Sequence, residues 1–423
     1  MNLYSLYLHI PFCRHRCAYC DFNTYAGMEA LISDYTYALC REIAHAAEHF
    51  PPDAGVHTLF FGGGTPSLLP LADLAQILHT ARAGFLFTDD CEITLEANPG
   101  TVSLDYLRGL RAMGINRLSM GMQSADPGDL RVLERIHDFF DVVNAVKWAR
   151  QAGFTNLNLD LIFGLPYQTL ASWQKTLDLA VGLNPEHLSV YSLILEHGTP
   201  MNAWVERGLL TEPDDDLAAS MYEWAMERLP QSGYAQYEIS NWAKREATGH
   251  VMACRHNLQY WYNQPYLGLG AGAHGFAGGV RTANVRAPRA YVERFGESTN
   301  QQIGKSANQQ TNKSANQQIN QPTNQPSKPA NPPAFPRTPA TVNATPIERF
   351  TEMQETMMVG LRLVEEGVNL PGFAARFGER AEAVFAKELG ELVERGLLEV
   401  GEERVRLTAR GRMMGNQVFM QFV

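Results

Sequence analysis

The sequence predicts an α/β fold in which parallel strands form a doubly wound sheet or an open or closed barrel. Between residues 5 and 192 it repeats one unit, in which a short apolar strand, a turn and a segment of helical periodicity follow one another. Such alternation favours parallel strands joined by right-handed crossovers. We expect six strands, at 6–10, 58–61, 92–96, 117–120, 157–161 and 188–191, and helices that include 32–47, 71–83, 104–113 and 141–152.

Residues able to hold a ligand follow the ends of these strands. Three cysteines come after the first strand and a glycine run, 62–64, comes after the second. Glu96 closes the third strand, Gln123 follows the fourth and Asp160 lies in the fifth. In doubly wound sheets and in barrels, ligands bind at the carboxyl ends of the strands. The sequence therefore predicts one shared site at that edge.

The chain divides into three predicted domains, 1–297, 298–346 and 347–423. The first carries the repeated unit. The second is rich in Asn, Gln, Pro, Ser and Thr and contains an eight-residue repeat at 305–312 and 313–320, a composition typical of a disordered insertion. In the third, 392–400, 404–407 and 408–419 are expected to form a helix, a short hairpin and a helix, as in a small winged-helix-like domain.

Composition excludes several classes of protein. The 423 residues include 45% hydrophobic residues, enough for a sizeable core, and 35 Lys and Arg against 45 Asp and Glu give a net charge of −10. Nucleic acid is therefore not an expected partner. The N-terminus lacks the features of a signal peptide, and no stretch reaches the roughly 20 apolar residues of a transmembrane segment. We expect a cytoplasmic protein, with peripheral membrane contact left open.

Cys13, Cys17 and Cys20 form the strongest motif in the chain. Three cysteines within eight residues of a reducing-compartment protein indicate metal binding rather than disulfides. Three thiolates can hold a cubane iron–sulfur cluster and leave its fourth iron open. The alternative is a zinc site completed by His9 or His15, although structural zinc sites usually combine a close pair of ligands with a distant pair.

With this motif the sequence resembles the radical S-adenosylmethionine (SAM) proteins, within them the group related to oxygen-independent coproporphyrinogen III oxidase. The resemblance implies a partial (β/α)6 barrel, a [4Fe–4S] cluster on the three cysteines, and S-adenosyl-L-methionine bound at the open iron, where the reduced cluster cleaves its sulfonium. It also implies which residues surround SAM. They are Tyr7, Tyr19, Gly63, Gly64, Thr65, Glu96, Gln123, Arg135 and Asp160.

Two departures separate this chain from the oxidases of the group. Those oxidases carry a further cysteine where this sequence has Phe22, and a longer N-terminal extension than the few residues before Tyr7. The motif HNLQYW at 256–261 instead matches the haem-chaperone branch. This resemblance implies haem as a cofactor, a haem acceptor protein as partner, and haem contacts from His256, Asn257, Tyr260 and Trp261.

Alternatives remain open at this point. His256 can be an axial haem ligand or a hydrogen-bonded structural histidine, and Cys254 can be a thiolate ligand or a buried thiol. His274 is a further candidate for the haem cavity, whereas Cys40 and Cys91 are expected in the core. At the level of function, a radical SAM oxidative decarboxylase and a zinc-bearing structural protein compete with the haem chaperone.

Overall fold

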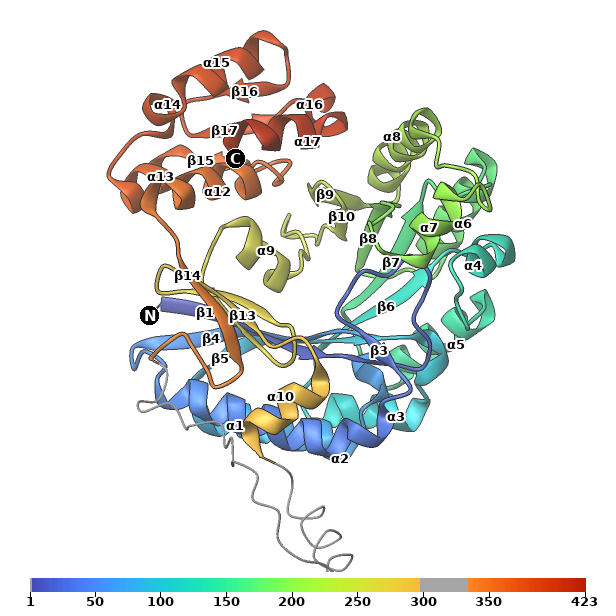
Figure 1. The fold of residues 1–423 in the computed structure, drawn as a ribbon. Helices are drawn as coiled ribbons and strands as arrows, with labels where there is room; N and C mark the ends of the chain where they lie inside the picture. Colours follow the sequence, from blue (N-terminus) through green and yellow to red (C-terminus); the bar gives the residue numbers. More distant parts are fainter. Residues whose placement is uncertain (1, 297–333) are drawn as a thin grey trace, which may run out of the picture.

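The computed structural model describes residues 2–296 and 334–423. Within them, twelve strands form one curved sheet in the order β14-β13-β12-β11-β1-β4-β5-β6-β7-β8-β10-β9 (Figure 1). The six predicted strands are confirmed and lie side by side in parallel: β1 Asn2–Ile10, β4 Ala54–Gly63, β5 Phe87–Ala97, β6 Arg117–Gln123, β7 Leu157–Phe163 and β8 His187–Ser192. The sheet does not close, because β14 and β9 remain separate edges in the described structure. This is the predicted partial barrel.

Helices cover the outer face of the parallel strands (Figure 1). The four helices predicted by residue range are confirmed, and further helices occur between and after the strands. In chain order the helices of this domain are α1 Ile32–Glu48, α2 Leu71–Gly84, α3 Leu104–Ala112, α4 Pro127–Val132, α5 Phe139–Gln151, α6 Leu170–Gly182, α7 Pro200–Glu206, α8 Asp215–Gln231, α9 Arg255–Trp261 and α10 Pro288–Phe295. Among the helices that the structure describes, none has the length and hydropathy needed to cross a membrane.

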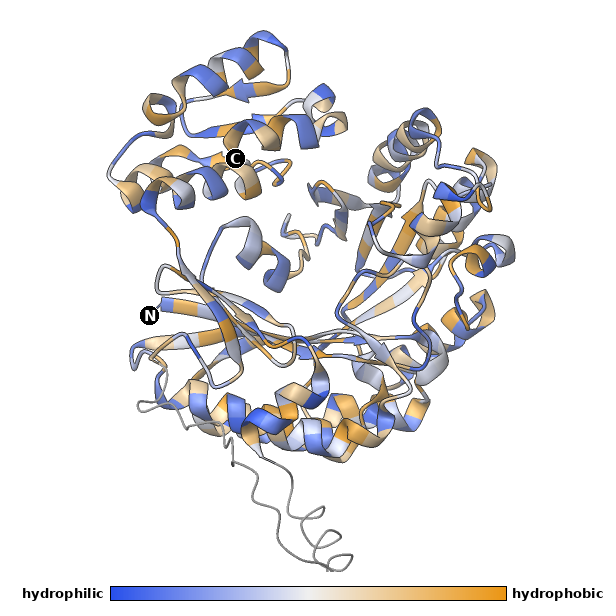
Figure 2. Ribbon diagram, in the orientation of Figure 1, coloured by the Kyte–Doolittle hydropathy of each residue, from blue (hydrophilic) through white to orange (hydrophobic). Residues whose placement is uncertain are grey.

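The two faces of the sheet differ in chemistry. Leu6, Leu59, Leu95 and other apolar side chains pack against the helices in the main core, and hydrophobic segments follow the strands in Figure 2. A second set of strand residues is polar and still buried: Ser5, Thr58, Glu92, Thr94, Arg117, Ser119, Asn158, His187 and Ser189. Because successive strand residues point to opposite faces, the polar set supplies hydrogen-bonding groups to the other, concave face.

The strands that extend the sheet at its two ends were not predicted. At one end these are β9 Tyr234–Glu238 and β10 Asn241–Lys244, and at the other β11 Tyr266–Leu269, β12 His274–Ala277, β13 Val280–Asn284 and β14 Thr341–Pro346. Most are only four or five residues long, which leaves little room for a periodic pattern.

Strand β14 corrects the predicted boundary of the insertion. The sequence assigned 298–346 to a disordered segment, but residues 341–346 pair antiparallel with β13. The sequence pattern is weak here, because β14 is an edge strand in which only half of the side chains are apolar and most are solvent-accessible. Just before it, the buried Thr338 hydroxyl donates to the carboxylate of Glu42 on α1 at 2.6 Å. The repeat at 305–320 lies outside the described residues.

The C-terminal domain forms a separate core around Met357, Phe373, Leu392 and Val405. It contains α12 Arg349–Gly360, α13 Leu370–Phe377, α14 Ala381–Val384, α15 Ala386–Glu394, α16 Ala409–Met413 and α17 Gly415–Phe419, with β15 Val368–Asn369, β16 Leu398–Val400 and β17 Arg404–Leu407 in a small sheet.

Two details of the C-terminal prediction were wrong. Residues 398–400 form a strand rather than the end of a helix, because α15 ends before Gly396, whose φ of 69° is unfavourable for other residues. The predicted helix 408–419 is divided into α16 and α17 at Met414.

Candidate functional site

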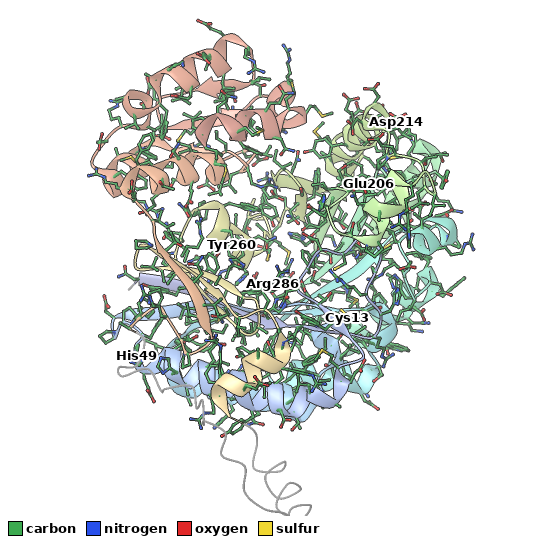
Figure 3. The ribbon with its side chains drawn as sticks, in the orientation of Figure 1. Cys13, His49, Glu206, Asp214, Tyr260 and Arg286 are labelled. Carbon is green, nitrogen blue, oxygen red and sulfur yellow. The ribbon has the colours of Figure 1, made fainter. Side chains whose placement is uncertain are left out.

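The three clustered cysteines lie in the loop that follows β1. Two short strands, β2 Phe12–Cys13 and β3 Tyr25–Ala26, pair in parallel and hold the two ends of this loop together. The backbone N–H of Cys20 donates to the carbonyl of Cys17 at 3.1 Å, which keeps these residues in one tight turn. Cys13, labelled in Figure 3, lines a cavity together with residues at the carboxyl ends of β4, β5 and β6.

Polar donors stand next to the sulfur atoms. The hydroxyl of Thr65 lies 3.6 Å from Cys13 Sγ, and Nη1 of Arg135 lies 3.5 Å from Cys17 Sγ. None of the cysteines is in a disulfide. Burial raises the pKa of the Cys13 and Cys20 thiols, so both stay protonated at neutral pH until a metal displaces their protons.

The structure disfavours a zinc site completed by His9. His9 is buried, and its ring nitrogens meet the Asn23 carbonyl at 2.9 Å and the Tyr7 hydroxyl at 3.0 Å. His15 lines the same cavity as the cysteines, and its Nε2 lies 3.4 Å from a carboxylate oxygen of Glu134. Of the two histidines, His9 is therefore the one already held by other partners.

A cavity of about 150 Å³ joins the cysteine loop to the carboxyl ends of the strands. It is lined by all three cysteines and by eight of the nine residues expected around SAM: Tyr19, Gly63, Gly64, Thr65, Glu96, Gln123, Arg135 and Asp160. Tyr7 is the exception, since it does not line this cavity and its hydroxyl hydrogen-bonds to His9. Phe22 lines the cavity and is 63% exposed.

The glycine run is required by close packing. A Cβ atom on Gly63, whose φ is +114°, would lie 2.5 Å from the His9 ring. A Cβ on Gly64 would lie 2.6 Å from the Phe12 carbonyl oxygen, which is backbone and cannot swing away. Larger residues would push the second strand end away from the cysteine loop.

Two carboxylates face the cavity. Glu96 accepts a hydrogen bond from the backbone N–H of Gly63 at 3.0 Å, and Asp160 accepts from the side chains of Asn158 at 2.8 Å and Ser119 at 3.2 Å. Burial is the main cause that raises the pKa of Glu96, and the negative charge of Asp160 raises it further, to about 8. Burial likewise raises the pKa of Asp160. A cationic ligand would favour the ionised form of both groups.

Gln123 and Arg135 complete the wall of the cavity. Gln123 has a φ of +64°, a left-handed conformation that costs energy for a residue with a side chain. Arg135 donates from Nη2 to the Gly121 carbonyl at 2.9 Å, which fixes its guanidinium between β6 and Cys17. Backbone strain such as that at Gln123 typically occurs at functional sites.

The motif HNLQYW forms helix α9, which lies within the concave side of the sheet (Figure 1). The His256 side chain is buried, and its Nδ1 lies 2.8 Å from the Thr58 hydroxyl and its Nε2 3.0 Å from the Tyr260 hydroxyl. Its ring stacks on Phe60. Burial lowers the pKa of His256 to about 3. In this structure His256 is a neutral, hydrogen-bonded structural residue.

The other motif residues contact different parts of the structure. The Tyr260 ring contacts Tyr266 edge-on at 4.7 Å between centroids, and Asn257 lies close to Tyr237. Trp261 lines a second cavity, of about 420 Å³, together with residues of the C-terminal domain. Figure 3 shows Tyr260 well separated from Cys13, so the motif and the cysteine loop are distinct places in the molecule.

The remaining sequence candidates do not join either cavity. Cys254 is buried and its thiol donates to Glu92 at 3.5 Å, while burial raises its pKa to about 12. His274 is exposed and does not line the cavity at Trp261. Cys40 and Cys91 are buried core residues, as predicted.

Sequence reasoning missed several contributors. Asn98 and Ser119 line the first cavity, and the positive charge of the fully buried Arg117 partly offsets the rise in the pKa of Glu96 and Asp160. These residues lie in or beside strands already assigned, where polar residues alternating with apolar ones were the available signal. No sequence signal indicated that α12 and α13 would close the cavity at Trp261.

Two protein-family models match the chain, one in its N-terminal part and one near its C-terminus. The model described as the radical SAM superfamily matches residues 7–180, and that described as the HemN C-terminal domain matches residues 347–414. Coproporphyrinogen III oxidase (HemN) from Escherichia coli, a solved radical SAM enzyme, has a TM-score of 0.76 at 26% identity; the match covers 100% of this chain and 90% of that chain.

Curated relatives resemble the chain along its length. Heme chaperone HemW from Bacillus subtilis is 36% identical over 421 residues, or 99% of both chains. Heme chaperone HemW from Mycobacterium tuberculosis is 36% identical over 98% of this chain and 93% of its own. The Escherichia coli heme chaperone HemW is 40% identical over 301 residues, which cover 70% of this chain and 77% of the relative.

Proposed function

Because this chain belongs to the HemW family of radical SAM heme chaperones, we propose that it binds haem and passes it to an acceptor protein. The observation that carries this proposal is the identity of 36% to a heme chaperone over 99% of both chains. The separation of the cysteine loop from α9 supports it, since the two sites can then hold different cofactors.

The cysteine loop fits a [4Fe–4S] cluster. Cys13, Cys17 and Cys20 each supply one thiolate, and Thr65 and Arg135 donate hydrogen bonds toward the sulfur atoms. Donors near the sulfurs stabilise the negative charge of a cluster. Three protein ligands leave one iron without a protein ligand, which is the position that SAM takes in the radical SAM family.

The first cavity fits SAM next to that open iron. Glu96 and Asp160 offer acceptors to its ammonium and ribose hydroxyl groups, whereas Arg135 offers a donor to its carboxylate. Gly63 and Gly64 allow the backbone to approach the ligand. When bound, the cluster supplies an electron for cleavage of the SAM sulfonium, and the protein supplies orientation. Tyr7 would act indirectly, by fixing His9 beneath Gly63.

The second cavity has a volume usual for a small-molecule site, and we propose it as the haem site. Its volume of about 420 Å³ lies within the range of about 300–1,000 Å³ usual for ligand pockets. Trp261 contributes an aromatic wall, and within the described residues its buried indole N–H has no hydrogen-bond partner. We propose that Trp261 forms the α9 wall of the haem site and that His256 holds the helix in place. Tyr260 and Asn257 do not line this cavity in the structure, and we propose that they contribute to haem binding from the preceding turn of α9.

We also propose the cellular compartment and the binding partners of the protein. Free cysteines at six positions suit a reducing compartment such as the cytoplasm. A net charge of −10 argues against nucleic acid as a partner. The partners that we propose from the family membership are haem, SAM and a haem acceptor protein.

An activity assay separates this proposal from an oxidative decarboxylase. The purified protein, reconstituted with iron and sulfide and supplied with SAM and a reductant without oxygen, is expected to leave coproporphyrinogen III unchanged. Product porphyrinogens are to be measured by chromatography, with an oxygen-independent coproporphyrinogen III oxidase as positive control. Decarboxylation by this protein at a rate comparable with that control would contradict the chaperone proposal.

A further inference from the structure

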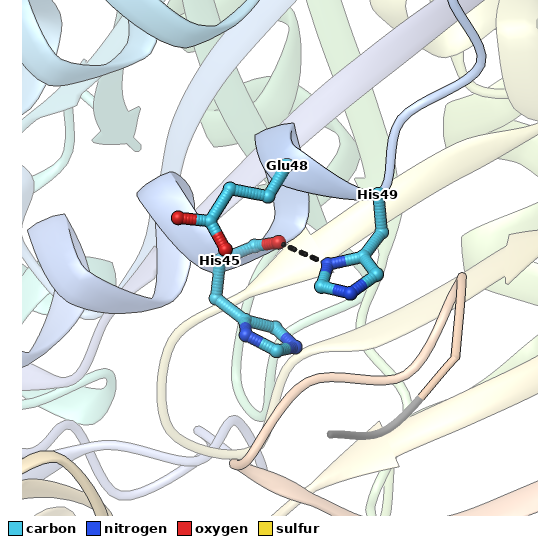
Figure 4. A group of neighbouring side chains, drawn as sticks. All are labelled: His45, Glu48 and His49. Atoms are coloured by element: carbon cyan, nitrogen blue, oxygen red, sulfur yellow. Dashed lines mark hydrogen bonds between the residues drawn. The ribbon is translucent and has the colours of Figure 1, made fainter. Parts of the chain in front are cut away.

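The last turn of α1 carries a group of metal-binding side chains that belongs to neither cavity. His45, Glu48 and His49 each offer one ligand atom, and these three atoms all lie within 4.8 Å of one another (Figure 4). His45 and His49 are half-buried and Glu48 is exposed. In Figure 3, His49 is well separated from both Cys13 and Tyr260.

The spacing of the three residues explains their convergence. Positions i, i+3 and i+4 of a helix lie on one face, so the His45, Glu48 and His49 side chains leave α1 in the same direction. The two imidazole rings are tilted by 38° with their centroids 4.6 Å apart. Both rings therefore lie close enough together to approach one ion.

The orientation of His49 also suits a metal ligand. Its Nδ1 lies 2.9 Å from the His45 carbonyl oxygen (Figure 4) and therefore carries the proton that it donates there. The tautomer that makes this hydrogen bond leaves the lone pair on Nε2. Metal-bound histidines almost always donate their second ring nitrogen to a carbonyl or carboxylate in this way, so His49 is already prepared for an ion.

The electrostatic surroundings favour a cation. Residue 48 is the last residue of α1, and the C-terminal end of a helix dipole is negative. The chain as a whole carries a charge of −10. Two neutral imidazoles and one carboxylate are a donor set typical of Zn²⁺ sites that keep an open fourth position, and imidazole also suits Co²⁺, Ni²⁺ and Cu²⁺.

We propose that His45, Glu48 and His49 bind a divalent transition-metal ion, with zinc as the expected ion and water in the fourth position. Binding would also tie down the end of α1. The next residue, Phe50, packs against Tyr4 and Phe85 with ring centroids 4.9 Å away in both cases. The ion would therefore stabilise the junction between α1, β1 and the turn before β5.

The test is a calorimetric zinc titration of the full chain after its cluster has been reconstituted, so that the clustered cysteines are occupied. Wild type is compared with His45→Ala, His49→Ala and Glu48→Gln. His79→Ala is the matched control, because His79 is an exposed histidine on the neighbouring helix α2. Circular dichroism and iron content are to be measured for each variant, so that a folding defect is recognised.

We expect the wild type and His79→Ala to bind one zinc ion more than His49→Ala. Residual binding at the site in His45→Ala should be at least about tenfold weaker, since even outer-shell changes cost metal sites 10–100-fold in affinity. X-ray absorption of the bound zinc should show nitrogen and oxygen ligands without sulfur. Equal zinc binding by wild type and His49→Ala, or wild-type binding only at millimolar zinc, would overturn the proposal.

Discussion

Replacement of Cys13, Cys17 or Cys20 by alanine is expected to abolish a stable [4Fe–4S] cluster. Each thiolate would hold a different iron, so no remaining ligand can substitute for the one removed. Purified and anaerobically reconstituted variants should contain far less than the about four iron and four sulfide ions of a cubane cluster and should lack its visible absorption. The measurement is metal and sulfide analysis together with absorption spectroscopy.

Two other cysteines supply matched controls for this experiment. Cys40 and Cys91 are buried in the core, away from the cavity that the clustered cysteines line. Cys40→Ala and Cys91→Ala should therefore keep full iron and sulfide content, with at most a modest loss of stability. If all three cluster-site variants kept about four iron and four sulfide ions per chain, the assignment of these ligands would be wrong.

The replacement His256→Ala is expected to weaken haem binding while leaving the cluster intact. Removing the imidazole leaves the buried hydroxyls of Thr58 and Tyr260 without this partner and opens a cavity beside Phe60. A cost on the order of 3 kcal/mol follows from such a loss. Displacement of α9 should lower haem affinity by at least about tenfold, or 1.4 kcal/mol, as measured by titration of the Soret band.

A second variant separates structural support from iron ligation. Glutamine can both donate and accept hydrogen bonds, so His256→Gln should recover most of the haem affinity if the histidine holds Thr58 and Tyr260. If His256 ligated the iron, the glutamine variant would behave like alanine, and added imidazole would restore the wild-type spectrum of His256→Ala. Rescue by imidazole would show that His256 gives up its hydrogen bond to Thr58 or to Tyr260 when haem binds.

The sequence predicted the parallel part of the fold well, for a physical reason. Buried strands such as β7 and helices such as α1 have apolar patterns set by one large core. Strand β14 was not predicted, because an exposed edge strand carries no such pattern and because its polar residues resemble the insertion before it. Gly396 was the overlooked signal for the end of α15.

The two cavities were predictable to different degrees. The first depends on strand ends whose order follows from the chain, so the sequence alone places Glu96, Gln123 and Asp160 together. The second depends on how the C-terminal domain packs on α9, which no local pattern encodes. For the same reason, the burial of His256 between Thr58 and Tyr260 could not be distinguished from a ligand role.

One anaerobic sample tests the central claim most directly, namely that a single chain holds a cluster, SAM and haem at separate sites. The protein is reconstituted with iron and sulfide, reduced, and examined by electron paramagnetic resonance before and after SAM is added, and then titrated with haem. We predict a [4Fe–4S] signal that SAM alters, followed by a Soret band that saturates at one haem per chain without loss of the cluster signal. Haem absorbance that never saturates, or haem that binds only when the cluster is lost, would contradict the account.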